Sequence, residues 1–526
     1  MKKIFKKISL MALGLVLFVP ACTDLDEELY SQVTADNFFS SDEEFISALG
    51  QAYSGFRRMG EHSLLWSINE IASDEIVVAT KGGDWFDGGI LLALHQHTYA
   101  PDNPFFNNAW GDIYANINNV NRLIFQFEQL GTPEADAFIA ELRAIRSLWY
   151  FWALDAFGNV PLVTDFTNTE TQGNATRQEV YDFVISELNE IIPLLTPDKN
   201  SATYARMNRW VALTIRMKLY LNAEVYTGTA NWAAAEADAD AIINSGLYTL
   251  EGNYASNFAL DNGGSQENIF VVPYDVNLFQ GFNWQQMTLH YVSQGTYGFN
   301  EQPWNGYATV EEFYNSYIDP AQNPGPQGLV WADQALTQST GTRDARLSNF
   351  IVGPQFLADG SRAEDGAFEA DDPDGAPLTF SPEINEIFPN SWRQAGARIG
   401  KYEFTSGPST MGNDMVLFRY ADVLLTKAEV ALRQGNSADA LTLVNQIRER
   451  AGVTPFTSIN LDNLYAERGR EMYVEMTRRQ DMIRFGKYDD PYWEKEQDAD
   501  DHWEIFPIPQ PQLDANNKLT QNAGYN

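Results

Sequence analysis

Residues 420–450 read YADVLLTKAEVALRQGNSADALTLVNQIRER. Apolar residues recur there at three-to-four spacing on both sides of Gly435-Asn436, which predicts two helices, 420–433 and 437–450, joined by a tight turn. The positions expected to face each other are Tyr420, Leu424, Ala428, Ala431, Ala440, Leu441, Val444 and Ile447. Because several of these side chains are small, the two helices can approach closely and pack as a pair.

A second pair of this kind comes earlier in the chain. Residues 207–226 and 232–245 are joined by Thr227-Gly228-Thr229, and alanines again occupy the expected contact positions. Helix, turn and alanine-rich helix is the unit of tetratricopeptide (TPR) repeats, although the period here is imperfect and the pairs are scattered. The same periodicity predicts helices over 118–130, 140–157 and 178–195, and one long helix over 462–485. The fold class is therefore mainly α, a TPR-like helical bundle rather than a repeat array.

Residues 251–415 differ from these helical parts. Glycine, proline, asparagine and aromatic residues dominate, with a short strand expected at Ile269–Pro273 and an exposed acidic loop at Asp359–Pro377. Long irregular regions inside helical proteins usually carry binding sites. We therefore expect one domain, 41–526, made of TPR-like helices (41–250), an irregular, loop-rich ligand-binding region (251–415), and C-terminal helices with a tail (416–526).

The composition excludes several classes of protein. The 526 residues include 71 acidic and 35 basic ones, a net charge of −36 with no basic patch, so nucleic acid is not expected as a partner. The single cysteine excludes an intramolecular disulfide and a cysteine-based zinc site, and five histidines leave little for a histidine-rich metal site. The sequence contains no phosphate loop, dinucleotide fingerprint or serine nucleophile elbow, so no cofactor is expected.

The first 40 residues read as a leader and a tether. A basic start, Met1–Lys7, and an apolar run, Ile8–Val19, too short to span a bilayer predict a signal peptide over 1–21. Val19-Pro20-Ala21-Cys22 resembles a bacterial lipobox, in which the leader is cut before the cysteine and the thiol carries lipid; the alternative is a free cysteine near an ordinary cleavage site. Residues 22–40 are then a lipidated acidic tether. Its acidic start resembles the surface-export signal of Bacteroidetes lipoproteins, and the alternative is a solvated tether with no export role.

Four stretches together resemble one family. They are Arg419–Glu429, Glu467–Gly486, Phe506-Pro507-Ile508-Pro509 leading to Gln521–Tyr525, and Ala144–Leu162. With the lipobox they resemble the SusD/RagB family of Bacteroidetes outer-membrane lipoproteins, over essentially the whole mature chain. The charged residues among Glu475–Arg484 are expected to hold helices together rather than to contact a ligand.

The resemblance implies a function as well as a fold. It implies a lipoprotein, anchored in the outer membrane and exposed on the cell surface, that binds oligosaccharide or polysaccharide and does not cleave it. The implied partner is a SusC-like TonB-dependent transporter, over which the protein lies as a lid. A neutral glycan is expected, starch-type α-glucan first, then laminarin-type β-glucan or fructan. The alternative is a structural lid of the transporter, with minor or peptide ligand binding.

Neutral glycans need flat aromatic platforms and polar groups at the rim, and one loop offers both. Lys81–Gly89 carries Trp85 and Phe86 between glycines. In the SusD pattern a tryptophan loop after Asn-Glu-x-x-x-Asp-Glu, here Asn69–Glu75, contacts starch. Asp84, Trp85 and Asp87 therefore take the ligand-binding role by resemblance. The alternative is that the rings pack on the body of the protein or on a partner.

A second set of candidates lies in the irregular region. Trp284 lies among amides in Asn283–Gln286, and Trp304 and Asn305 lie in Gln302–Tyr307. Each stretch joins aromatic rings to hydrogen-bonding side chains, the mix that a sugar site requires. Trp149 and Trp152, by contrast, lie on a helical stripe and are expected in the core.

Three patterns point to other chemistry and are weaker. Asp84 with Asp87, or Asp74 with Glu75, could form the carboxylate pair of a glycosidase, but 71 acids make such pairs inevitable. His95 and His97 could bind a metal, but no third ligand is evident and packed histidines are favoured. The acidic residues at 371, 372 and 374 resemble a calcium loop that lacks its terminal glutamate. We therefore expect neither an enzyme nor a metal site.

Overall fold

The computed structural model describes residues 42–318, 344–365 and 377–525. The predicted signal peptide, the whole tether including Cys22, the acids at 371, 372 and 374, and much of the predicted acidic loop lie outside these ranges. Residues 45–526 form one compact unit, described below. Within the described ranges, no helix combines the length and the hydropathy needed to cross a membrane.

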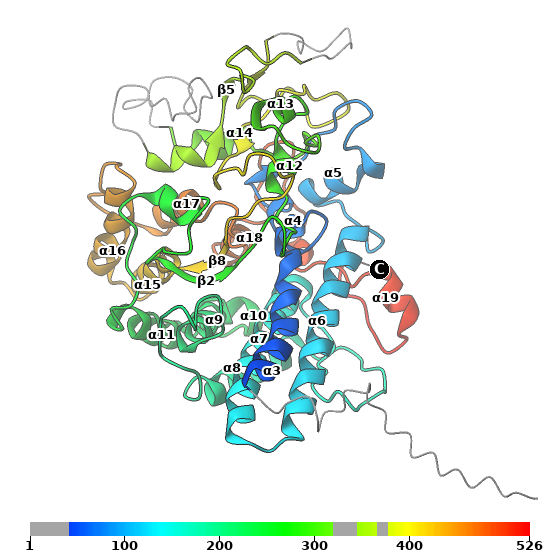
Figure 1. Ribbon diagram of the computed structural model, residues 1–526, viewed down its shortest axis with the longest axis vertical. Coiled ribbons are helices and arrows are strands. Elements are labelled where there is room, and N and C mark those ends of the chain that lie inside the picture. The colour runs from blue at the N-terminus through cyan, green and yellow to red at the C-terminus, as the bar shows by residue number, and fades with distance from the viewer. Residues whose placement is uncertain (1–41, 319–343, 366–376, 526) are drawn as a thin grey trace, which may run out of the picture. The chain divides into compact units, whose positions relative to one another are not determined.

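Helices are the main regular structure of the unit, as the sequence predicts (Figure 1). The longer ones are α3 (Asp42–Tyr53), α6 (Pro104–Glu128), α7 (Pro133–Phe157), α8 (Arg177–Ile191), α9 (Arg209–Leu221), α11 (Trp232–Asn244), α15 (Tyr420–Arg433), α16 (Ser437–Arg450) and α17 (Leu461–Met472). Neighbours in the chain pack together, α6 on α7 and α7 on α8, and α11 packs on α15. That last contact joins the two predicted helix pairs, which lie far apart in the sequence.

Capping explains where several helices begin. Thr176 and Glu179 form a reciprocal capping box at the start of α8. Asn103 and Thr132 accept backbone N–H groups at the starts of α6 and α7, each followed by proline. These signals lie outside the apolar stripes, so α6 and α7 are longer than the predicted helices over 118–130 and 140–157.

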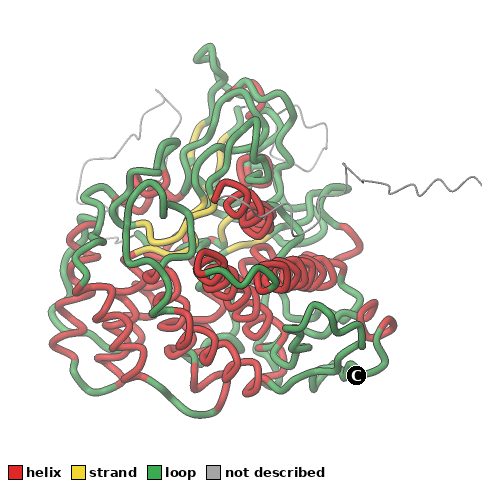
Figure 2. The backbone as a smooth tube through the Cα atoms, turned by 60° about the horizontal axis from the view of Figure 1, so that its bottom comes forward, coloured by secondary structure: helices red, strands yellow, loops and turns green. Residues whose placement is uncertain are grey.

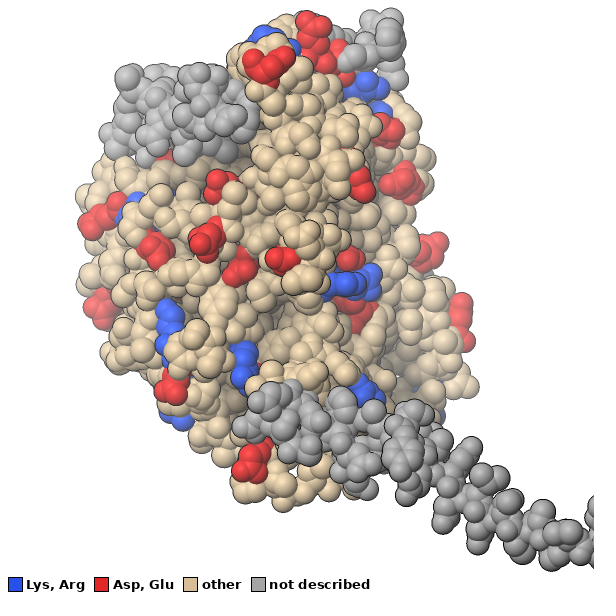
Figure 3. Space-filling model, in the orientation of Figure 1, with Lys and Arg blue, Asp and Glu red and all other residues tan. Residues whose placement is uncertain are grey.

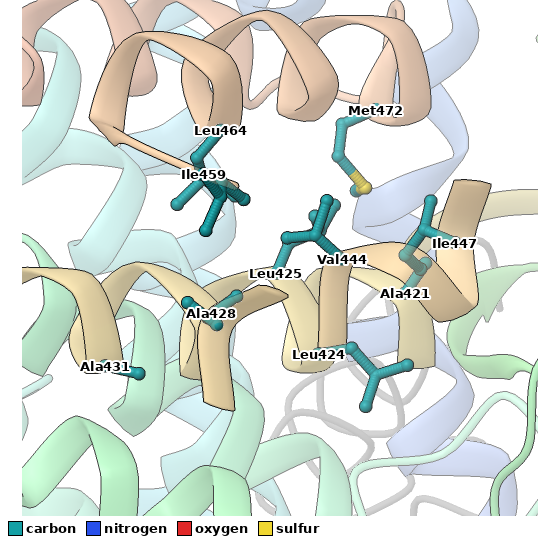
Figure 4. Close-up of a cluster of buried hydrophobic side chains, with 11 residues drawn as sticks. Ala421, Leu424, Leu425, Ala428, Ala431, Val444, Ile447, Ile459, Leu464 and Met472 are labelled. Atoms are coloured by element: carbon teal, nitrogen blue, oxygen red, sulfur yellow. The ribbon is translucent and has the colours of Figure 1, made fainter. Parts of the chain in front are cut away.

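The predicted pair over 420–450 is confirmed at both helices. Ala421, Leu425 and Ala428 of α15 pack against Ala440 and the following apolar residues of α16. Leu464 and Met472 of α17 close the other side of this cluster, and Figure 4 shows these side chains gathered between the three helices. Burying such side chains stabilises the fold by about 1.5 to 3 kcal/mol for each large one.

An aromatic cluster fills the space between the N-terminal helices and the strand that carries Phe270. Trp149 is fully buried and stacks on Phe56 at 5.2 Å between ring centroids, with Trp152 set edge-on to both rings. Phe270 meets Phe56 edge-on from the strand side. The prediction that Trp149 and Trp152 belong to the core is confirmed.

The predicted long helix over 462–485 is wrong. The chain instead forms α17 and α18 (Arg478–Arg484), separated by five residues. Val474 and Met476 have φ of 54° and 55°, so the backbone is left-handed twice within this break. Such a conformation costs a β-branched residue free energy and persists only where surrounding contacts impose it.

Those contacts come from α4 (Leu65–Ile71) and the residues after it. A carboxylate oxygen of Glu75 accepts the N–H of Val474 at 2.7 Å, and one of Glu70 accepts the N–H of Met476 at 2.7 Å. The indole of Trp66 donates to the carbonyl of Val474 at 3.1 Å. These partners lie about four hundred residues away in the sequence, so helical periodicity could not reveal the break.

Buried ion pairs surround this break. The guanidinium of Arg419 contacts Glu267, Glu471 and Glu475 at 2.5 to 2.8 Å, and all four side chains are buried. Arg484, likewise buried, pairs with Glu429 and Asp481. The charges among Glu475–Arg484 therefore hold helices together, as predicted, and the exposed carboxylates scatter over the surface (Figure 3).

The loop-rich part is built on four short two-stranded ladders, which lie between the helices and the loops (Figure 2). The strand expected at Ile269–Pro273 is confirmed as β2 (Asn268–Val272), and it pairs antiparallel with β8 (Met415–Arg419). The other pairs are β1 (Ile76–Val77) with β3 (Ala308–Thr309), β4 (Phe350–Ile351) with β7 (Arg398–Ile399), and β5 (Gly353–Pro354) with β6 (Thr379–Phe380). The β1–β3 pair brings the segments that follow β1 and precede β3 close together.

Candidate ligand-binding site

An open hollow of about 420 Å³ lies between these segments. His62, Asp84, Trp85, Asp87, Tyr291, Gln302, Pro303 and Trp304 line it. Two stretches that the sequence singled out separately, the loop 81–89 and the segment 302–304, thus form one site. Its volume lies in the lower part of the roughly 300–1,000 Å³ of small-molecule sites.

Backbone hydrogen bonds hold the loop that carries Trp85. Lys81 and Asp84 exchange N–H···O bonds of 2.9 and 3.0 Å, which closes a tight turn. Gly82 donates to the carbonyl of Pro389 at 3.2 Å, so the turn is also tied to a neighbouring loop. Trp85 and Asp87 have φ of 62° and 42°, and a left-handed residue other than glycine costs about 1 kcal/mol or more.

The Trp85 side chain packs on the body and still lines the hollow. Its indole N–H donates to the carbonyl of Trp304 at 2.7 Å. The ring lies so close to Gly306 that a Cβ there would be 2.4 Å from Cζ2 of Trp85, and Tyr307 meets it edge-on at 5.9 Å. One part of the ring is therefore packed on the body, as one alternative drawn from the sequence has it, and another part is open to the hollow.

Trp304 supplies a second ring beside the first. It is half-buried, and the His62 ring lies edge-on to it at 5.1 Å. Burial lowers the pKa of His62, so its imidazole is neutral at physiological pH. A neutral imidazole can both donate and accept a hydrogen bond.

The two carboxylates of the hollow are acceptors. Asp84 accepts the hydroxyl of Tyr291, whose pKa burial raises well above its usual value. Asp87 is exposed and has no hydrogen-bond or ion-pair partner within the described chain. None of the residues that line the hollow is a lysine or arginine. The lining therefore offers rings and hydroxyl acceptors without a lysine or arginine, and the nearby Arg393 guanidinium lies 5.8 Å from the centroid of the Tyr291 ring.

Two predicted site residues do not belong to the hollow. Trp284 is 2% exposed and lies against Trp66 at 4.4 Å, in a cluster with Phe282 and Tyr402, so it cannot stack on a ligand. It lies on the short helix α12 (Trp284–Thr288), whose residues are all buried.

Asn305 is likewise fully buried. Its amide donates to the carbonyl of Arg393 at 3.0 Å and accepts from Arg398 at 2.9 Å. The neighbouring Trp304 faces the hollow because Asn305, at φ 53°, turns the backbone between them. The expectation that Trp284 and Asn305 contact ligand is therefore corrected.

The sequence missed two residues of the hollow, His62 and Tyr291. Each is a single residue in an irregular segment, with no accompanying pattern. Tyr291 reaches the hollow through its contact with Asp84, which is 207 residues away in the sequence. No local signal could have found either residue.

The weaker chemical patterns have structural explanations. Asp74 is held by both nitrogens of a bidentate Arg478, at 2.6 and 2.7 Å, and Glu75 is buried. His95 is buried against the carbonyl of Trp493, and His97 bonds Asp498 at 2.7 Å. Among the described residues, no three histidine, cysteine or carboxylate side chains are grouped to hold a metal ion.

Two family models match the chain. One, described as "Starch-binding associating with outer membrane", matches residues 26–221, and the other, "SusD family", matches residues 266–525. The chain therefore belongs to the SusD family, as the resemblance in its sequence indicated.

Individual relatives agree with this assignment. The starch-binding protein SusD of Bacteroides thetaiotaomicron is 26% identical over 496 residues, which cover 89% of this chain and 86% of that protein. SusD-like protein P38 of Formosa agariphila is 24% identical and covers 93% of each chain. Surface glycan-binding protein A of Bacteroides thetaiotaomicron, solved in complex with laminarihexaose, has the same fold with a TM-score of 0.70 at 20% identity, covering 91% of this chain and 99% of that one.

Proposed function

We propose that this protein is a glycan-binding lipoprotein of the outer membrane, exposed at the cell surface and anchored through Cys22. It captures oligosaccharide or polysaccharide and delivers it to a SusC-like TonB-dependent transporter, without cleaving it. The observation that carries this proposal is the hollow in which Trp85 and Trp304 lie beside Asp84 and Asp87, with no cation in its lining.

The chemistry of the hollow supports a neutral saccharide. The flat rings of Trp85 and Trp304 stack against the apolar C–H faces of a sugar. Asp84 and Asp87 accept hydrogen bonds from its hydroxyls, and the Gln302 amide and His62 can donate or accept. An anionic glycan would bring its charge towards two carboxylates without a compensating lysine or arginine in the lining.

Starch-type α-glucan is the first candidate ligand. The SusD of Bacteroides thetaiotaomicron, a relative of this chain, is described as a starch-binding protein. The description of the family model that matches residues 26–221 also says starch-binding. Laminarin-type β-glucan comes second, because a solved structure of the same fold is described as a laminarin-binding SusD-like protein. Fructan is the third.

Titration calorimetry of the purified protein with starch, laminarin and fructan oligosaccharides tests the proposal. We expect binding to one of them and a loss of about tenfold or more with Trp304→Ala, because a stacking ring at the open side of the hollow is removed. Phe166→Ala removes an exposed ring elsewhere and is the matched control. Failure of the protein to bind any neutral glycan would refute the proposed ligand class.

A structural lid of the transporter is the alternative that the same experiments address. If the chain copurifies with a SusC-like barrel but binds no saccharide alone, the lid function replaces glycan capture. Anchoring is tested separately: Cys22→Ser should release the protein from the membrane fraction, while wild-type protein should incorporate a labelled fatty acid at that residue.

A further inference from the structure

Two exposed phenylalanines lie together, one of them on the loop that lines the hollow. Phe86 is 43% exposed and Phe388 is 46% exposed, and their ring centroids are 5.5 Å apart at an interplanar angle of 38°. Phe86 stands between Trp85 and Asp87 in the chain, both of which line the hollow. Its Cα is therefore about 3.8 Å from the Cα of each of these residues.

Backbone bonds and one asparagine brace both segments that present these rings. Thr80 donates to the carbonyl of Ile387 at 2.9 Å and Ser391 donates to that of Thr80 at 2.8 Å, on either side of the Phe388 tip. Within residues 385–392, the segment that carries Phe388, the Asn385 side chain donates to the carbonyl of Asn390 at 3.2 Å and accepts the N–H of Trp392 at 2.8 Å. The pair is thus held in place before any ligand arrives, which reduces the ordering cost of binding.

The hollow is too small to contain a long ligand, so a bound polysaccharide must extend beyond it. About 420 Å³ holds only a short part of a polysaccharide, and the rest of the chain must cross the rim. The loop 81–89 forms one wall, and Phe86 of this loop forms the exposed pair with Phe388. Exposing apolar rings to water costs free energy, and this free energy is regained when a flat apolar face covers the rings.

We propose that Phe86 and Phe388 form a second aromatic platform, which binds the sugar units that follow those in the hollow. This inference rests on the proposed glycan binding. It adds that the ligand is a saccharide chain long enough to span both platforms. The occupant is the same neutral saccharide, because the two platforms are continuous through Trp85, Phe86 and Asp87.

The test measures affinity against chain length. Disaccharides to heptasaccharides of the series that binds are titrated into the wild type, Phe86→Ala, Phe388→Ala and the double variant. We expect wild-type affinity to rise with length, and the double variant to keep its affinity for the shortest ligands but to lose about tenfold for the longest. Trp304→Ala should weaken short and long ligands alike.

Two further variants separate stacking from other causes. Phe86→Tyr with Phe388→Tyr keeps both flat rings and should restore the dependence on length, whereas the corresponding leucines should not. Phe166→Ala is the matched control for an exposed phenylalanine, and an unchanged thermal midpoint shows that the variants are folded. If the double alanine variant retains the full gain with chain length, the second platform is refuted while glycan capture stands. If the wild type binds no saccharide at all, both proposals are refuted.

Discussion

Gly306 determines how closely the Trp85 ring can approach the body of the protein. The ring occupies the space that a Cβ at this position would need, and its N–H is fixed by the carbonyl of Trp304. The open part of the ring is thus set at one height in the hollow, although Trp85 lies on a loop. Positioning of this kind is what a stacking platform requires.

We predict that Gly306→Ala displaces this ring. The added methyl group would lie 2.4 Å from Cζ2, so the ring must move, at a cost in the free energy of unfolding of about 1 to 3 kcal/mol. Saccharide affinity should fall with it, measured by calorimetry. Gly83→Ala on the same loop meets no atom within 4 Å and serves as the control; an equal effect of both substitutions would contradict the prediction.

Single residues of the hollow differ in how far the sequence could predict them. Asp84, Trp85 and Asp87 were found because glycines on both sides marked a loop with aromatic residues. Trp284 and Trp304 each lie among amides and look alike in the sequence, yet one is buried and the other open. Burial of Trp284 depends on Trp66, Phe282 and Tyr402 meeting around it, and local composition carries no record of that cluster.

At the scale of elements, buried charges determine where the C-terminal helices end and how they pack. Arg419 lies at the junction of β8 and α15, and its side chain contacts three glutamates. Glu471 lies on α17 and Glu475 lies just after it. Arg478 ties α18 to the segment after α4. Each of these bonds joins elements that the chain separates, so they specify the packing as well as stabilise it.

Removing Arg419 should therefore be severe. We predict that Arg419→Met lowers the free energy of unfolding by about 3 to 5 kcal/mol, because three buried carboxylates lose their shared partner. Chemical denaturation measures the loss. Arg58→Met, which breaks the more exposed pairs with Glu61 and Asp112, should cost less than about 1 kcal/mol, and comparable losses for the two would argue against the role given to Arg419.

Elements with strong local signals were predicted well. The helices 420–433 and 437–450 match α15 and α16, because periodicity, turn and stop signals agree with the tertiary structure. The helix over 462–485 failed because contacts from Glu70, Glu75 and Trp66 override a continuous helical pattern. The short strand pairs β4–β7 and β5–β6 escaped prediction, because two-residue strands have no period to detect.

At the scale of the whole molecule, the net negative charge and the burial of several carboxyls both disfavour the ionised form of those carboxyls. The net charge is −36, and burial raises the pKa of several carboxyls, of Asp112 and Asp489 to about 6 and of Glu504 to about 7. Burial also raises the pKa of Glu70 and Glu75, with Lys401 and Arg478 acting against the shift. These carboxyls therefore bind more protons in the folded protein than in the unfolded chain at mildly acidic to neutral pH, whereas the histidines His62, His95, His97 and His290, whose pKa burial lowers, bind fewer.

It follows that these carboxyls should lower the stability as the pH rises through about pH 7, above the range in which the histidines of the unfolded chain are protonated. A carboxyl whose pKa is raised on folding destabilises the fold once it ionises. Glu70→Gln keeps an acceptor for the N–H of Met476 but cannot ionise, and should reduce the fall between about pH 5.5 and about pH 8 by roughly 1 to 3 kcal/mol. Denaturation midpoints at the two pH values provide the measurement. A pH profile in the variant as steep as that of the wild type would show that Glu70 is ionised throughout.

The break between α17 and α18 also bears on the order in which the chain acquires its structure. Its left-handed residues are held by side chains some four hundred positions upstream, so α4 must wait for almost the last part of the polypeptide before its carboxyls find their partners. Closing so long a loop is entropically costly and slow. The N-terminal helices can form early, but the final locking of the molecule belongs to the end of synthesis, and a chain that stops short of residue 473 would leave Glu70 and Glu75 without the backbone donors that compensate for their burial.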